Sequence, residues 1–199
     1  MIKKTCWIII IAGLLSLESV FAAAKTTLVI GYAELESDPR YHNQKLYAGI
    51  EFKPRGRPWP GAEVGLRDSK IVGRALGVKF RLEKVSGENS AELASEINRL
   101  YKEQNVGFFI VDAPAETLVT VTKETHGKKL LLFNVSEPAD ELRESDCNSQ
   151  LMHTIPSYAM LADGLAQYLV SKRWKDILLL EGILPSDHSL ARAFRRAAK

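Results

Sequence analysis

Two short polar segments hold the residues that are best placed for chemistry. They are Asp112-Ala113-Pro114 and Asn134-Val135-Ser136-Glu137, and each directly follows an apolar run. Asp112 is suited to orienting a ligand or acting as a base, but an aspartate just before Ala113-Pro114 also suits a helix cap. Ser136 is a candidate nucleophile, whereas Glu137 is expected to cap a helix or face solvent. The two segments therefore predict a binding site, a catalytic site or two ordinary turns.

The elements around these segments indicate how they would be positioned. Residues 106–111 and 130–133 are continuous apolar runs, as expected for strands covered on both faces. Between them, an apolar stripe and the closing Gly127 predict a helix. Such a unit places its two strands parallel in one sheet. Ligands of open α/β sheets bind outside the carboxyl ends of the strands, so both polar segments are candidates for the ligand site.

The rest of the chain extends this alternation. Further strands are predicted at residues 28–32, 78–85 (half-buried or at an edge), 151–155 and 177–180. Helices are predicted over 62–76, from Asn89, from Pro156-Ser157 and from Ser186 or Asp187. This pattern indicates an α/β class with a mainly parallel sheet. By the same strand-end argument, Tyr32, Ser186 and Asp187 join the candidate ligand-binding residues, although capping or solvent exposure is the favoured role of Asp187.

A long polar segment, residues 33–61, follows the first predicted strand. It is rich in aromatic residues, Pro and Gly, and connections of this length are uncommon in a compact domain. It overhangs the same edge of the sheet as the two polar segments. It is therefore either a lid or docking surface, or an insertion without a role in the site.

The N-terminus has the pattern of a secretory signal peptide. Lys3 and Lys4 precede an apolar segment, residues 7–17, and small residues follow at 22–24. The alternative is a transmembrane anchor, but the apolar run is short for a bilayer and Glu18 interrupts its end. Cleavage is expected after residue 22 or 24, so the exported protein is expected to be periplasmic. It would then keep Cys147, in a polar loop, as its one cysteine.

Several function classes find no support in the sequence. The net charge is only +3 and the basic residues are scattered, which argues weakly against a nucleic-acid partner. The sequence has no Gly-x-Ser-x-Gly elbow, Walker loop or dinucleotide-binding Gly-x-Gly-x-x-Gly. The four histidines show no metal-ligand spacing. We therefore expect no metal, no cofactor and no enzymatic activity.

The order of elements, together with several local sequences, resembles a known family. These sequences are Gly61-Ala62-Glu63-Val64-Gly65-Leu66-Arg67-Asp68, the turn from Phe133 to Leu142, and Trp174–Gly182 leading into Ser189–Phe194. They resemble periplasmic solute-binding proteins of the leucine/isoleucine/valine-binding type, which serve ABC importers. Phe133–Pro138, Asp146-Cys147, His153–Ser157 and Met160–Asp163 look more narrowly like a subgroup associated with pyrroloquinoline-quinone (PQQ)-dependent alcohol oxidation systems.

This resemblance implies a two-lobed clamp that holds a small-molecule ligand between Rossmann-like lobes and docks on an ABC permease at the inner membrane. The implied organisation is a signal peptide at 1–24, a first α/β lobe at 25–150 and an incomplete second lobe at 151–199, as in a truncated product or fragment. Amino-acid binders of the family hold their ligand with hydroxyl side chains at positions that fall near Ala113–Ala115 and Pro138 here. These residues lack hydroxyls, so a ligand other than a standard branched-chain amino acid is expected. Two alternatives remain open: a ligand sensor derived from a binding protein, and a small exported α/β hydrolase-like enzyme using Asp112, Ser136 or Cys147.

Overall fold

The structure is a computed structural model, and it describes residues 26–42, 44–45, 51–52 and 56–199. The predicted signal peptide and Cys6 lie outside the described residues. None of the described helices is long and apolar enough to cross a membrane.

A five-stranded, fully parallel sheet forms the centre of the fold, with the strand order β4-β1-β5-β6-β7. The strands are β1 (Thr26–Leu35), β4 (Val78–Gly87), β5 (Phe108–Asp112), β6 (Leu131–Asn134) and β7 (Leu151–His153). The helices are α2 (Trp59–Asp68), α3 (Lys70–Leu76), α4 (Ser90–Gln104), α5 (Ala115–Glu124), α6 (Tyr158–Ser171) and α7 (Pro185–Ala197). Two short 3-10 turns, η1 (Pro39–Tyr41) and η3 (Asp140–Arg143), and a small β2 (Gln44–Lys45)–β3 (Glu51–Phe52) ladder complete the described elements. The predicted α/β class with a mainly parallel sheet is confirmed.

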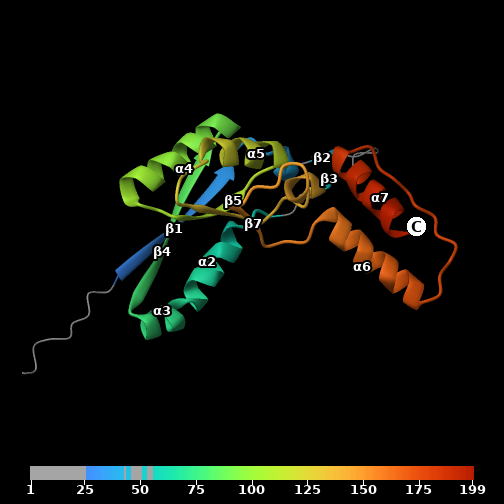
Figure 1. Ribbon diagram of the computed structural model, residues 1–199, viewed down its shortest axis with the longest axis horizontal. Helices are drawn as coiled ribbons and strands as arrows, with labels where there is room; N and C mark the ends of the chain where they lie inside the picture. Colours follow the sequence, from blue (N-terminus) through green and yellow to red (C-terminus); the bar gives the residue numbers. More distant parts are fainter. Residues whose placement is uncertain (1–25, 43, 46–50, 53–55) are drawn as a thin grey trace, which may run out of the picture.

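The two faces of the sheet are covered differently. Figure 1 shows α4 and α5 on one side of the sheet and α2 and α3 on the other. The core lies under α4 and α5, where apolar side chains of the two helices pack on the strands; it includes Ala33, Val85, Leu93, Ile97, Leu100, Phe109, Val111, Leu118, Val121 and Leu132. Burial of such side chains, worth roughly 25 cal/mol per Å² of apolar surface, stabilises this half of the sheet.

The opposite face is covered by two short helices instead of the one helix predicted over 62–76. Ser69 separates α2 from α3, and Gly73 is their one buried residue. A Cβ on Gly73 would lie 2.6 Å from the Val78 carbonyl oxygen, so α3 approaches β4 through bare backbone. The apolar side chains of Val64 and Ile71 therefore remain exposed, although their spacing suggested a packed face.

Several element ends follow from local side-chain or backbone signals. The predicted helix start at Asn89 is confirmed, because the Asn89 side chain accepts a hydrogen bond from the Glu92 amide. Ser157 caps α6 in the same way, accepting from the Met160 amide. Gly127 follows α5 with a φ of 77°, which suits a glycine. The strands β1 and β5 run slightly past their predicted ends, so that Glu34 and Asp112 are strand residues.

The region after residue 150 departs more from prediction. β7 pairs with β6, which extends the same sheet past residue 150; the division into lobes stays a prediction. The buried strand predicted at 177–180 is wrong: these residues form no strand, and Leu178 and Leu180 are more than four-fifths exposed. A strand needs a neighbour for its backbone groups, and none of the described strands lies beside this segment. α6 and α7 pack on each other through a small cluster around Ala162 and Phe194.

Candidate functional site

The site lies where the strand order of the sheet reverses. β1 has β4 on one side and β5 on the other, and the chain leaves β1 and β5 in opposite directions across the sheet. The register places Glu34 beside Asp112, and Tyr32 beside Lys84. Since side chains alternate along a strand, Tyr32, Glu34, Lys84 and Asp112 project from the same face, the one that α2 covers.

We define the strand-end cluster as the ionisable and polar side chains that meet at this point. Its members are Tyr32, Glu34, Asp38, Arg40, Tyr41, Arg57, Lys84, Asp112, Ser136 and Glu137.

Asp112 is at the centre of the strand-end cluster. Its side chain is fully buried, and its Oδ1 accepts a hydrogen bond of 2.7 Å from the Tyr41 hydroxyl. Arg40 lies 3.3 Å from the same oxygen, and Arg57 lies 3.5 Å from Oδ2. The helix-cap alternative for Asp112 is wrong, because Pro114 is the residue before α5 and the Asp112 carboxylate accepts from Arg40 and Tyr41 instead. The carboxylate faces the cluster instead.

Arg40 ties the turn after β6 to the segment after β1. Its guanidinium contacts Asp38 at 2.6 Å and Glu137 at 3.1 Å. It also donates to the Ser136 carbonyl and hydroxyl oxygens, at 3.3 and 3.2 Å. The buried side chain of Asn134 shapes this turn, since its Oδ1 accepts from the Ser136 and Glu137 amides. Glu137 is thus buried and ion-paired, so it does not face solvent. Its carboxylate also accepts a hydrogen bond of 3.1 Å from the amide of Ala139, the residue before η3, in keeping with the capping alternative.

Aromatic rings and cations alternate on the α2 side of the cluster. The Arg57 guanidinium lies 4.5 Å from the centre of the Tyr41 ring. Trp59, the first residue of α2, meets Tyr32 edge-on with 4.9 Å between ring centres. Lys84 lies 5.2 Å from the centre of the Trp59 ring and 2.9 Å from a Glu34 oxygen. The rings of Tyr41 and Trp59 therefore each contact a cation of this chain.

Burial shifts the protonation of several members of the cluster. Desolvation raises the pKa of Tyr32 well above its usual value, and the carboxylates of Asp112 and Glu34 raise it further. Burial, followed by the hydrogen bond to Asp112, raises the pKa of Tyr41 likewise. Burial also raises the pKa of Glu137, while Arg40 opposes this effect. The two phenols thus keep their protons at neutral pH.

The cluster is not built for nucleophilic catalysis. Ser136 receives a hydrogen bond from Arg40, and no histidine belongs to the cluster in the part of the chain that is described. A hydroxyl without an adjacent base is a weak nucleophile. Cys147 is exposed, and none of the described residues forms a disulfide with it. No group of three or more potential metal ligands occurs among the described residues.

The residues predicted from sequence are only partly brought together. Tyr32, Asp112, Ser136 and Glu137 belong to the strand-end cluster. Ala113 is buried and Pro114 leads into α5, and neither has a polar side chain to offer. Ser186 and Asp187 lie in the first turn of α7, where Asp187 accepts a hydrogen bond of 3.1 Å from the Leu184 amide, the capping role favoured for it.

Six of the ten residues of the cluster were not predicted from the sequence. Arg40, Tyr41 and Arg57 belong to the long segment after the first strand, which was a lid or docking candidate without named residues. That segment supplies ion pairs to the site, so it is no mere insertion. Glu34 fell in the same segment, because β1 runs past its predicted end, and Lys84 gave no signal beyond the alternation of its strand.

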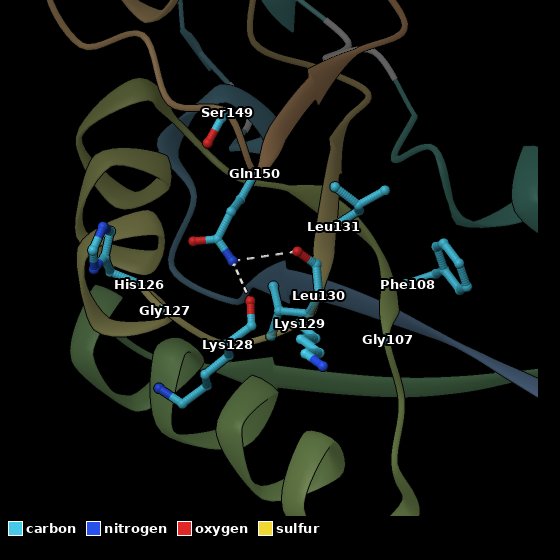
Figure 2. A pocket seen from close by; sticks show the side chains of 10 residues that line it. All are labelled: Gly107, Phe108, His126, Gly127, Lys128, Lys129, Leu130, Leu131, Ser149 and Gln150. Atoms are coloured by element: carbon cyan, nitrogen blue, oxygen red, sulfur yellow. Dashed lines mark hydrogen bonds between the residues drawn. The ribbon is translucent and has the colours of Figure 1, made fainter.

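A separate hollow lies at the other end of the sheet. Figure 2 shows it at the amino ends of β5, β6 and β7, where Gln150 donates hydrogen bonds to the Lys128 and Leu130 carbonyl oxygens. It has a volume of about 600 Å³, and its lining includes His126, Lys128 and Lys129 but no carboxylate. Its place is opposite to the strand ends at which α/β sheets bind ligands. The strand-end cluster is therefore the stronger candidate site.

Solved structures share this architecture. The chain aligns with an ABC transporter substrate-binding protein from Desulfitobacterium hafniense in complex with Leu, with a TM-score of 0.63 and 17% identity over 86% of this chain and 47% of that chain. A branched chain amino acid ABC transporter periplasmic ligand-binding protein from Burkholderia xenovorans LB400 gives 0.65 and 17%, over 86% and 43%. LivJ from Streptococcus pneumoniae, in complex with isoleucine, gives 0.60 and 17%, over 87% and 47%.

The chain has the fold of a type I periplasmic binding protein lobe. It spans less than half the length of each of these structures. No protein-family model and no curated protein matches the sequence. Structural similarity thus confirms the predicted fold. At 17% sequence identity, it shows the fold and not the function.

Proposed function

We propose that this chain is the ligand-binding part of a periplasmic solute-binding protein of an ABC importer, and that it performs no chemistry of its own. One observation carries the proposal: on a fold shared with such proteins, buried ionisable groups converge at the reversal point of the sheet. Asp112 and Glu137 reach this point from strand ends, and Arg40 reaches it from the segment after β1. A rigid, polar strand-end site suits recognition of a small solute.

The same proposal includes export and delivery. The basic start, short apolar core and small residues at 22–24 support cleavage of a signal peptide, and release into the periplasm would bring the chain to a permease at the inner membrane. N-terminal sequencing of periplasmic protein should find a mature start between residues 23 and 25. Recovery of Met1 in the membrane fraction would contradict this.

We propose further that the ligand is not a standard branched-chain amino acid. Ala113, Pro114 and Pro138 offer no side-chain hydroxyl, and a buried polar ligand group without its hydrogen bond costs about 1–3 kcal/mol. Two such losses would weaken binding on the order of 100-fold. Calorimetric titration with leucine, isoleucine and valine should show little or no binding, whereas micromolar affinity would contradict the proposal.

The link to PQQ-dependent alcohol oxidation belongs to this proposal too, and it is supported by the resemblance of residues 133–138 and 153–157 to that subgroup. A gene deletion tests it. Slower growth on a primary alcohol than on the corresponding acid is the expected result, and equal growth on both would reject the link.

The solute-binding function itself is tested by thermal stabilisation. A panel of amino acids, amines, carboxylic acids, alcohols and sugars is added to the purified chain at millimolar concentration. A binder present at 100 times its Kd stabilises the folded state by about 2.7 kcal/mol. At least one solute should raise the melting temperature without being consumed. Turnover of a solute, or no shift with any, would count against the proposal.

A further inference from the structure

The strand-end cluster contains one continuous chain of ion pairs. Lys84 pairs with Glu34 at 2.9 Å, and Arg57 lies between Glu34 at 3.8 Å and Asp112 at 3.5 Å. Arg40 continues the chain from Asp112 to Asp38 and Glu137. Among the described residues it joins four carboxylates to three cations, so it is one positive charge short of balance.

Three oxygen atoms of the strand-end cluster are buried without a hydrogen-bond partner in the described structure. They are the Tyr32 hydroxyl oxygen, Glu34 Oε2 and Asp112 Oδ2. The side chains belong to residues that are 0%, 8% and 0% exposed. All three lie on the α2-facing side of β1 and β5, and Glu34 is directly opposite Asp112 in the register. Leaving such groups unpaired is costly, which points to an absent partner.

Arg57 marks where that partner would bind. Its Nη1 atom lies nearest to the Glu34 and Asp112 oxygens but makes no hydrogen bond with either one, and it too is buried without a partner. Its other terminal nitrogen, Nη2, donates to the Leu35 and Glu36 carbonyl oxygens instead. The Arg57 guanidinium therefore lies beside both carboxylates without a hydrogen bond to either one.

The missing partner is defined by its chemistry. It has to donate about three hydrogen bonds to oxygen atoms and to bring one positive charge, and an alkylammonium group has three N–H donors and that charge. A carboxylate would meet three acceptors, and a quaternary ammonium would have no donor to offer. The faces of Tyr41 and Trp59, which already hold cations, suit an organic cation.

From these observations we propose that the site takes a primary amine, whose ammonium binds between Glu34 and Asp112 with Tyr32 as the third acceptor and adds the positive charge that the ion pairs lack. Arg57, which makes no hydrogen bond to either carboxylate, competes for the same oxygens. The inference rests on the proposed solute-binding function and specifies its ligand class. It predicts that side chains of β1 and β5 bind the charged end of the ligand.

The test is calorimetric titration of the purified chain with four probes of similar size: pentylamine, pentyltrimethylammonium, pentanoate and 1-pentanol. Pentylamine should bind at least about tenfold more tightly than the other three, since one hydrogen bond to a charged group is worth about that factor. D112N and E34Q should each weaken pentylamine binding at least about tenfold. R57Q should strengthen it, because a competing cation is gone.

R81Q provides the matched control for R57Q, because Arg81, on β4, pairs with Glu83 and Gln104 outside the cluster. It should leave the affinity unchanged, and circular dichroism verifies that each variant is folded; E34Q serves if D112N does not fold. Pentylamine binding that D112N and E34Q leave unchanged overturns the inference, as does preferential binding of one of the other three probes. If a panel solute binds but pentylamine does not, only the ligand class is wrong; if no solute binds, the proposed function falls with it.

Discussion

Asp112 joins three other members of the strand-end cluster. Its fully buried carboxylate is approached by Arg40, Arg57 and the Tyr41 hydroxyl. D112A should lower the free energy of unfolding by about 3 kcal/mol, because it leaves two partly buried cations without this partner. Urea unfolding followed by circular dichroism measures this. E96A is the control, since Glu96 pairs with Arg99 in solvent and should cost less than about 1 kcal/mol. Equal effects of the two substitutions would contradict a central role of Asp112.

The hydroxyls of Tyr32 and Tyr41 should lose their protons at a higher pH than those of ordinary tyrosines, because their pKa values are raised. Burial raises the pKa of both hydroxyls above the unfolded value of about 10, so their contribution to stability is complete below pH 10 and is lost as the pH rises further. Absorbance at about 295 nm should show a component that titrates above that of free tyrosine. Y32F and Y41F should each reduce this late component. A single transition near pH 10 in the folded wild type would show that neither phenol is shielded.

At the scale of elements, the contact between β4 and α4 offers a clear test. Gly87 ends β4, and a Cβ there would collide with backbone atoms of Leu93 in α4. Backbone atoms of a helix cannot move aside as the end of a flexible side chain can. G87A should therefore destabilise the fold by roughly 1–3 kcal/mol. G65A is the matched control, because a Cβ on Gly65 in exposed α2 meets nothing within 4 Å. It should stabilise by about 0.5–1 kcal/mol through helix propensity alone. If G87A and G65A changed the free energy of unfolding in the same direction, the close packing of β4 on α4 would be contradicted.

The ends of helices could be predicted from the sequence where a residue within about one turn determines them. Asn89 and Ser157 start helices through bonds to amides only three residues away, and Gly127 ends one through its own conformation. The segment at 177–180 failed because apolar composition alone does not supply a neighbouring strand. Most of the site was missed for a similar reason: Arg40 and Asp112 are 72 residues apart, and no local pattern links them.

At the scale of the whole molecule, the turn after β6 serves both the site and the α6–α7 pair. Ser136 and Glu137 bind Arg40, and the next residues hold α6: the Tyr158 amide donates to the Pro138 carbonyl oxygen, and the Ala159 amide to Asp140. Arg196 of α7 also pairs with Asp140, at 3.0 Å. Figure 1 shows α6 and α7 standing beside the sheet, with this turn between them and the core. A ligand at Ser136 would therefore act on the segment that positions α6 and α7.

The central claim is that the strand-end cluster is the ligand site. The most direct measurement is the change in backbone amide NMR signals when a stabilising solute from the panel is titrated into the isotopically labelled chain. We expect the largest shifts at Glu34, Arg57, Asp112 and Ser136, while Gly127 and Gln150, in the hollow at the opposite end of the sheet, stay unchanged. Shifts confined to Gly127, Gln150 and their neighbours would contradict the claim and place binding at the other end of the sheet.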